Sequence, residues 1–251
     1  MLPVARHGAI VEAVNSATTI STDQLVQLLG VSAETVRRDL ALLEERGALR
    51  RVHGGAASIQ NRTAEASFSE RASAQHAAKI YMARIATDLL VNGQTVTIDI
   101  GTSAVEVARA IAPGWRGTVA TPSLLVAAEL AGRSGIDVLI SGGRVRGGDL
   151  ACANAHAKAL FADLYADIAF VGSGALDAAA GLTDYHLDEV DIRRTIIANS
   201  ARSYVLADSS KLGHIAPHRV CGLDAVSGLI TDSPAPAITA AINDAGGEVL
   251  S

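Results

Sequence analysis

The feature that most constrains this chain is a helical pattern near its N-terminus that is followed at once by a basic hairpin pattern. Residues 32–47 read SAETVRRDLALLEERG, and residues 48–56 read ALRRVHGGA. Val36, Leu40 and Leu43 recur at spacings of four and three, which predicts a helix with one buried stripe. The arginine-containing first turns of this helix face elsewhere. Such a helix beside a basic wing is typical of a segment that reads DNA.

The chemistry of the early turns supports this interpretation. In a helix-turn-helix, the first residues of the second helix reach base edges, where arginine pairs with guanine and a threonine methyl contacts thymine. The strand pair that follows carries basic side chains that suit phosphates. A three-helix bundle with a solvated arginine pair is the alternative, but it does not explain the whole series. The residues expected to contact DNA are Ser32, Thr35, Arg37, Arg38, Arg51 and His53, with Arg50 beside them.

The ends of this unit are also marked in the sequence. Ser32 suits the N-cap of the reading helix, and Gly47 provides the backbone freedom that its end needs. Glu34 and Asp39 suit the positive half of the helix. The other elements expected here are helices over residues 5–17 and 22–30, a tight turn over residues 30–32, and an N-cap at Ser21 or Thr22.

Composition narrows the class of protein. The 251 residues are 49% hydrophobic, which predicts well-filled cores, and no run approaches the ~20 apolar residues that cross a bilayer. Cys152 and Cys221 lack metal-type spacing and suit a reduced cytoplasm. Residues 1–62 hold seven basic and six acidic side chains, although the whole chain carries a net charge of −5. We therefore expect modest, salt-dependent DNA affinity per subunit and a homo-oligomer that engages paired half-sites.

From residue 93 onward, apolar strands alternate with helices. This alternation predicts an α/β domain with a mostly parallel sheet covered on both faces. A long helix over residues 70–91 is expected to precede it. Strands are expected over residues 94–100, 117–121, 136–141, 168–172, 204–207 and 229–230, the last of them before a final helix over 235–245; other helices are expected over 105–111, 123–132, 155–164 and 192–201.

Polar clusters follow several of these strands, at the edge where ligands bind in such folds. Gly101, Thr102 and Ser103 join a strand to a helix, so free N–H groups and two hydroxyls suit a phosphate there. The alternative is that Ser103 is an ordinary helix cap. The other clusters lie over residues 121–123, 141–144, 172–174 and 208–211.

The chain resembles the DeoR family of bacterial transcription regulators over nearly its whole length. The matching residues are Arg6, the segments 31–40, 43–47 and 51–56, and Phe68, Arg71 and Lys79. The resemblance implies a winged helix-turn-helix over residues 1–57, a linker over 58–75 and a sugar-phosphate-sensing domain over 76–251. The sensing domain is expected to look like sugar-phosphate isomerases, whose matching glycine-threonine-serine loop binds a sugar phosphate.

The resemblance also implies an effector site. Asp208 and Lys211 match an aspartate-x-x-lysine segment, and Glu189 and Arg193 match a segment in which many members carry lysine instead of this arginine. Glu189 and Arg193 could equally form a surface pair at i,i+4. Pro122 replaces the family's usual asparagine, and residues 151–155 lack a glycine often found there, so the effector's identity stays open. The residues expected to bind the effector are Asp99, Gly101, Thr102, Ser103, Thr121, Ser123, Gly142, Gly143, Glu189, Arg193 and Lys211.

The resulting prediction is a repressor of a carbohydrate-metabolism operon that a phosphorylated sugar or polyol releases from operator DNA. A sugar-phosphate isomerase is the rival, with Asp99 or Asp177 as the base. The related isomerases carry lysine-glycine-glycine where this chain has residues 181–183, GLT, so no enzyme activity is expected. Pro217 lies between His214 and His218, and no metal or cofactor is expected.

Overall fold

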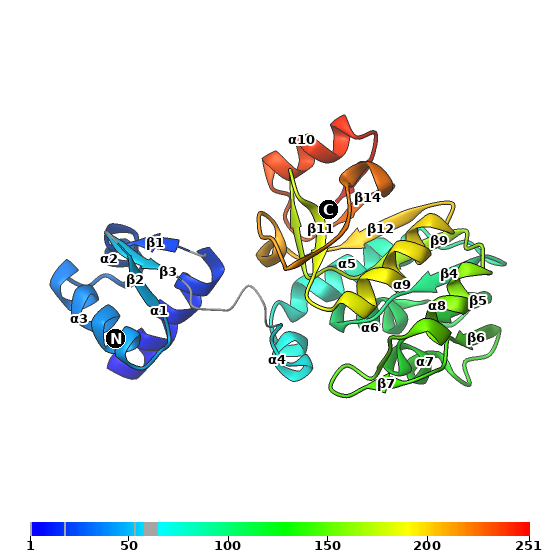
Figure 1. The fold of residues 1–251 in the computed structure, drawn as a ribbon, viewed down its shortest axis with the longest axis horizontal. Helices are drawn as coiled ribbons and strands as arrows, with labels where there is room; N and C mark the ends of the chain where they lie inside the picture. Colours follow the sequence, from blue (N-terminus) through cyan, green and yellow to red (C-terminus); the bar gives the residue numbers. More distant parts are fainter. Residues whose placement is uncertain (1, 18, 53, 58–64) are drawn as a thin grey trace. The chain divides into compact units, whose positions relative to one another are not determined.

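The computed structural model describes residues 2–17, 19–52, 54–57 and 65–251 of the chain. The chain divides into two compact units, Met1–Ala64 and Glu65–Ser251, which are coloured by sequence in Figure 1. Each unit has its own hydrophobic core. No helix of the described residues is long and apolar enough to span a membrane.

The first unit combines three helices with a small antiparallel sheet of strand order β1-β3-β2. The expected helices and the hairpin are confirmed, while the strand that precedes the second helix is an addition. The helices are α1 (Pro3–Ala17), α2 (Thr22–Leu29) and α3 (Ala33–Glu45), and the strands are β1 (Thr19–Ser21), β2 (Arg50–Val52) and β3 (Gly55–Ala57).

Local signals fix these boundaries. Ser21 forms a capping box with Gln24 at the start of α2. Gly47 follows α3 with φ +66°, and the carbonyls of the last turn accept the N–H groups of residues 47 and 48. A Cβ at Gly55 would lie 2.1 Å from the Ile20 carbonyl oxygen, so the approach of β1 to β3 requires glycine there. The predicted stripe of α3 is confirmed, because its apolar residues join a core with Ile10, Val14, Leu25 and Leu49.

The second unit is built on a seven-stranded sheet in which every pairing is parallel. Its strand order is β15-β14-β12-β9-β4-β5-β6, which confirms the expected α/β architecture. From one edge to the other, the strands are β15 (Glu248–Leu250), β14 (Gly228–Ile230), β12 (Ser203–Leu206), β9 (Ile168–Val171), β4 (Thr95–Ile98), β5 (Gly117–Thr121) and β6 (Ile136–Ile140).

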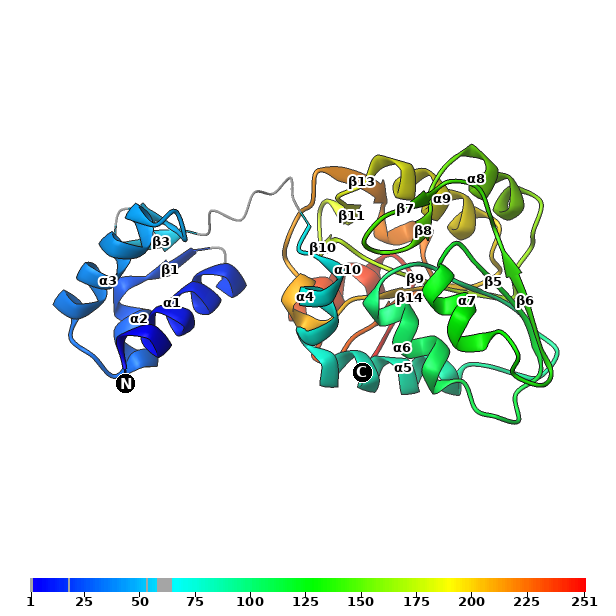
Figure 2. The ribbon, with the colours of Figure 1, turned by 90° about the horizontal axis from the view of Figure 1, so that it is seen from below.

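Helices cover both faces of this sheet, as Figure 2 shows for α5 and α6 on one side and α8 and α9 on the other. Alternate residues of β9 enter opposite cores: Phe170 packs with α5, α6 and α7, whereas Val171 packs with α8, α9 and α10. The covering helices are α5 (His76–Asp88), α6 (Thr102–Ala110), α7 (Leu124–Leu130), α8 (Ala155–Ala162), α9 (Leu187–Ala198) and α10 (Pro236–Asp244).

Short elements surround the carboxyl edge of the sheet. An antiparallel sheet of order β10-β11-β13 and the hairpin β7-β8 were not expected from the sequence. They comprise β10 (Ala175–Asp177), β11 (Gly181–Asp184), β13 (His218–Cys221), β7 (Val145–Arg146) and β8 (Ala151–Cys152); two 3-10 helices, η1 (Ser209–Lys211) and η2 (Leu223–Ala225), complete the unit.

The structure corrects three expected elements. The helix expected over residues 70–91 is divided into α4 (Phe68–Ser73) and α5, because Gln75 takes φ +51° and Lys79 donates to the carbonyls of Arg71 and Ala74. Helix α9 begins at Leu187 rather than at residue 192. The sheet does not end at β14, since β15 pairs with it after α10.

Candidate DNA-binding surface and ligand pocket

The first turns of α3 present the predicted DNA-reading side chains. Ser32 is the N-cap, and its Oγ accepts the Thr35 N–H at 3.2 Å. The side chains of Arg37 and Arg38 are 64% and 80% exposed. Glu34 lies 3.8 Å from Arg37 and 3.4 Å from Arg38, and such exposed pairs are weak. The two guanidinium groups are therefore available to a partner.

The hairpin formed by β2 and β3 continues this basic surface. Arg50 and Arg51 are exposed on β2. The Arg51 N–H donates to a Glu44 carboxylate oxygen at 2.8 Å, which fixes the hairpin against α3. His53, also predicted to contact DNA, lies outside the described residues.

A partly buried ion pair holds α1 against α3. Asp39 accepts Arg6 Nε at 2.6 Å and Arg6 Nη2 at 3.1 Å, and His7 Nε2 lies 2.9 Å from the same carboxylate. The hydrogen bond from Arg6 holds the pKa of Asp39 below its usual range. The sequence interpretation placed Asp39 beside the positive end of the helix, whereas the structure shows that its partner is the side chain of Arg6.

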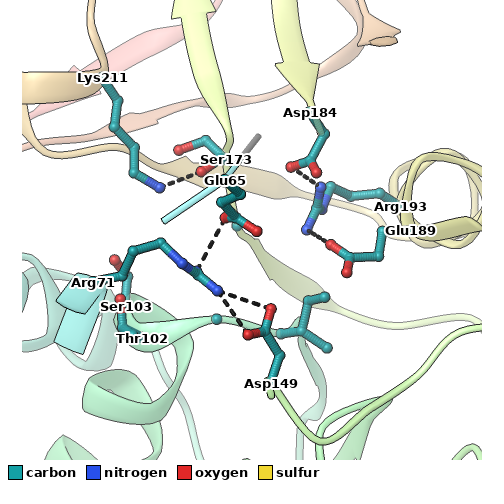
Figure 3. Close-up of a pocket in the computed structure, with 13 residues that line it drawn as sticks. Glu65, Arg71, Thr102, Ser103, Asp149, Ser173, Asp184, Glu189, Arg193 and Lys211 are labelled. Carbon is teal, nitrogen blue, oxygen red and sulfur yellow. Dashed lines mark hydrogen bonds and ion pairs between the residues drawn. The ribbon is translucent and has the colours of Figure 1, made fainter. Parts of the chain in front are cut away.

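A polar pocket lies at the carboxyl edge of the large sheet, after β4, β9 and β12 (Figure 3). Six of the residues predicted to bind an effector line it together: Gly101, Thr102, Ser103, Glu189, Arg193 and Lys211. The other lining residues are Glu65, Arg71, Ile100, Asp149, Gly172, Ser173 and Asp184.

Buried charges form one wall of the pocket. Arg193 on α9 contacts Asp99 at 2.5 Å, Glu189 at 3.4 Å and also Asp184. Glu189 and Arg193 are only 5% and 2% exposed, so the alternative of a solvated surface pair is wrong. Although burial acts against the charged form, the three carboxylates raise the pKa of Arg193 well above its ordinary value. Asp99 itself does not line the pocket, but it contacts Arg193, which does.

Glu189 has an unusual protonation range. Burial raises its pKa to about 8, an effect that the Arg193 charge partly opposes. Its second oxygen contacts the guanidinium of Arg146 from the β7-β8 hairpin. At neutral pH most molecules therefore hold this carboxyl in its neutral form, in which it can donate a hydrogen bond.

The opposite wall suits an anion. Thr102 and Ser103 are buried in the first turn of α6, and Gly101, with φ +106°, is the N-cap without a side-chain capping bond. Ser103 is therefore not an ordinary helix cap, which removes that alternative. Lys211 Nζ donates to the carbonyl of the neighbouring Ser173, and burial lowers the pKa of this amine. A helix N-terminus with a nearby lysine favours phosphate.

Besides Asp99, four other predicted residues do not line the pocket. Thr121 Oγ1 accepts the Ser123 N–H at 3.0 Å, and Ser123 Oγ caps α7 through the Val126 N–H at 3.2 Å. Both hydroxyls are thus used in the turn after β5. Gly142 and Gly143 lie in the loop before β7 with positive φ. The β7-β8 hairpin that follows this loop reaches the pocket instead, through Asp149 in its turn.

Glu65 and Asp149 are site residues that the sequence interpretation missed. Both bind Arg71, which the family resemblance had matched without a role. No motif surrounds Asp149, and Glu65 lay in the expected linker. The signal that could have pointed to them is Arg71, the family-matched residue that both acids contact. Among the described residues, no group of three His, Cys, Asp or Glu side chains is arranged to hold a metal ion.

Comparison with known proteins covers both units. The family model "DeoR C terminal sensor domain" matches residues 74–233, and "DeoR-like helix-turn-helix domain" matches residues 6–62. The HTH-type transcriptional regulator YulB of Bacillus subtilis is 33% identical over 97% of this chain and 95% of its own length. The glycerol-3-phosphate regulon repressor of Escherichia coli is 30% identical over 94% and 93%. Ribose 5-phosphate isomerase A of Methanocaldococcus jannaschii aligns with a TM-score of 0.42 and 16% identity, covering 55% of each chain.

Proposed function

The chain belongs to the DeoR family of transcriptional regulators, and from this premise we propose that it represses a carbohydrate-metabolism operon until a phosphorylated sugar or polyol binds its sensor domain. The observation that carries the proposal is the polar pocket at the carboxyl edge of the parallel sheet, where a buried helix N-terminus faces Lys211. The same chain carries the exposed arginines of α3. The name of the glycerol-3-phosphate regulon repressor supports this effector class.

In the proposed complex, the two ends of the effector meet different walls. The N–H groups and hydroxyls of Thr102 and Ser103, with the Lys211 amine, bind the phosphate. Glu189 and Asp184 lie where they can bind hydroxyl groups of the sugar or polyol. Thr121, Ser123, Gly142 and Gly143 line no part of this pocket, so we assign them to shaping the nearby loops rather than to contacting the ligand.

We propose sensing rather than catalysis at this site. Asp99, one of the two candidate bases, accepts Arg193 Nε at 2.5 Å and the Gly172 N–H at 2.9 Å. Asp177, the other, accepts the N–H groups of residues 179 and 180 in the turn between β10 and β11. Neither carboxylate lines the pocket. The relatives are likewise named as regulators.

A transcription regulator acts in the compartment that holds its operator DNA. We therefore propose a cytoplasmic homo-oligomer whose paired heads bind two half-sites. The effector weakens operator binding because it prefers the arrangement of the chain that does not bind DNA.

The test is a mobility-shift titration with the promoter region of the protein's own operon and a panel of phosphorylated and unphosphorylated sugars and polyols. We expect one phosphorylated compound to release the complex and its unphosphorylated parent to leave it intact. Lys211→Gln should abolish release, whereas Lys158→Gln, on the exposed surface of α8, should not. Specific DNA binding that no compound releases would contradict the proposed effector. Absence of specific binding would contradict the repressor itself.

A further inference from the structure

The charge balance of the pocket does not suit an incoming anion as it stands. Three cationic residues line the pocket, but four carboxylates line it too. Even with Glu189 mostly neutral at pH 7, three charged carboxylates offset the three cations, so the pocket has no excess positive charge for a phosphate until an acid leaves. The cations are Arg71, Arg193 and Lys211, and the carboxylates are those of Glu65, Asp149, Asp184 and Glu189.

Two of these carboxylates are fixed in place. Asp184 and Glu189 both contact the guanidinium of Arg193, which is itself almost completely buried. Asp184 also accepts the Tyr185 N–H at 2.6 Å. Removing either acid would leave a buried arginine with unsatisfied donors, which is costly. The carboxylates that can leave are therefore Glu65 and Asp149.

Both of these acids occupy Arg71, as the dashed lines in Figure 3 show. Arg71 Nη2 lies 2.8 Å from each carboxylate oxygen of Asp149, and Arg71 Nη1 lies 3.1 Å from Glu65. The remaining nitrogen, Nε, donates to the Ala66 carbonyl at 2.9 Å. Carboxylates and phosphates accept the arginine donors in the same way. Asp149 and Glu65 thus hold the positions of an anionic ligand.

The backbone of Arg71 is held independently of these partners. Lys79 Nζ, buried beneath α4, donates to the Arg71 and Ala74 carbonyls. Asp149 is itself buried, but it follows the exposed Gly147 and Gly148 in the turn of the β7-β8 hairpin. It also contacts Arg146 Nη2 at 2.7 Å, so it keeps a cationic partner when it leaves Arg71. The backbone of Arg71 and its Nε therefore stay bound without the two acids, and the acidic partners are the members that can be exchanged.

We propose that the effector's phosphate displaces the carboxylates of Asp149 and Glu65 from Arg71, which makes Arg71 a ligand-binding residue that internal acids occupy in the free protein. This inference rests on the proposed function. It also supplies a route for the signal. Glu65 is the first residue of the sensor unit, and residues 58–64 connect it to the DNA-binding unit. Ligand binding therefore releases the point at which the connecting segment joins the sensor domain.

The test uses inorganic phosphate as the probe, titrated calorimetrically into the full-length protein at constant ionic strength. We expect Asp149→Asn and Glu65→Gln to bind phosphate at least about fivefold more tightly than the wild type, because each removes a competing charge. Arg71→Gln should bind at least about fivefold more weakly. Asp191→Asn, an exposed acid on α9 outside the pocket, is the matched control and should not change the affinity.

A second measurement follows the connecting segment. Hydrogen exchange of the peptide covering residues 65–73 should become faster when phosphate binds the wild type, and phosphate should have no such effect in Arg71→Gln. Phosphate that binds the wild type, Asp149→Asn and Arg71→Gln with equal affinity would overturn the exchange at Arg71 while leaving the sensing function intact. Phosphate binding by none of the proteins would overturn the anion site and the proposed function with it. Because the effect of Asp149→Asn is a gain, it does not depend on whether Arg71→Gln folds.

Discussion

We expect Glu189 to set the pH range in which the pocket binds an anion. Its pKa of about 8 means that it is mostly neutral at pH 7 and negatively charged at pH 9. Burial also lowers the pKa of Lys211, so both groups make the pocket more negative as the pH rises. We expect the affinity for sulfate, whose charge is constant over this range, to fall between pH 7 and pH 9. Each pKa unit by which binding shifts Glu189 corresponds to a tenfold change in affinity.

The Glu189→Gln variant tests the contribution of this residue apart from that of the other pocket residues. The variant should bind sulfate with a flatter pH profile above pH 7, measured by calorimetry in matched buffers. A profile that is unchanged by the substitution would show that another group controls the affinity.

Asp39 makes the first unit sensitive to acid. Because Arg6 lowers its pKa in the folded state, its ion pair stabilises the fold above the ordinary pKa of a carboxyl group. That stability is lost as the pH falls from about 5 through the lowered pKa. Asp39→Asn should melt at a lower temperature than the wild type at pH 7 and show a smaller further decrease in acid. Glu12→Gln, on the exposed side of α1, is the control, and equal acid profiles for the two variants would contradict the role of Asp39.

At the scale of elements, substitutions in α3 are expected to distinguish base contacts from phosphate contacts. If Arg37 or Arg38 pairs with a base, its replacement by Ala should cost roughly 1–3 kcal/mol of operator binding and relax the sequence preference. If it contacts phosphate, affinity should fall equally on all sequences and the salt dependence should become shallower. Fluorescence anisotropy with operator and scrambled DNA over a range of salt concentrations measures both. Arg84→Ala, at an exposed position of α5, is the control. If both α3 variants bind the operator as tightly as this control does, α3 is not the surface that reads DNA.

Elements with a strong local pattern could be predicted from the sequence. The stripe of Val36, Leu40 and Leu43 has a helical period, and most strands of the central sheet are continuous apolar runs. The strands β1, β7, β10 and β13 have no such run, because each contains polar or charged residues beside its apolar ones. They exist through pairing with distant segments; β13, for example, pairs with β11, over thirty residues earlier.

The same limit applied to the site. Thr102, Ser103 and Lys211 were predicted because each follows a strand, where polar residues gather in such folds. The ion pair between Arg71 and Asp149 was not predicted, since the two residues are 78 positions apart and no local pattern links them. Sequence reasoning also treated Glu189 and Arg193 as a possible surface pair, because their spacing alone does not show what packs above them.

At the scale of the whole molecule, the two units are expected to unfold separately, since each has its own core. Leu40→Ala in the first unit and Ile98→Ala in the second each remove a buried side chain, at a cost of about 2–5 kcal/mol. Differential scanning calorimetry should show two transitions, of which each substitution lowers one. A single transition lowered by both substitutions would show that the units unfold together.

The order of the central strands along the chain also determines when DNA binding and effector sensing become possible during synthesis. The DNA-binding unit needs nothing beyond β3, which ends at Ala57, whereas β4 at the middle of the sensor sheet needs β9, which ends at Val171. At a ribosomal rate of about 5–20 residues per second, this gap lasts about 6–23 seconds. Each nascent chain therefore carries a completed DNA-binding head before its sensor can fold. We expect a premature stop codon between residues 57 and 171 to leave a fragment that contains the DNA-binding unit and does not respond to the effector.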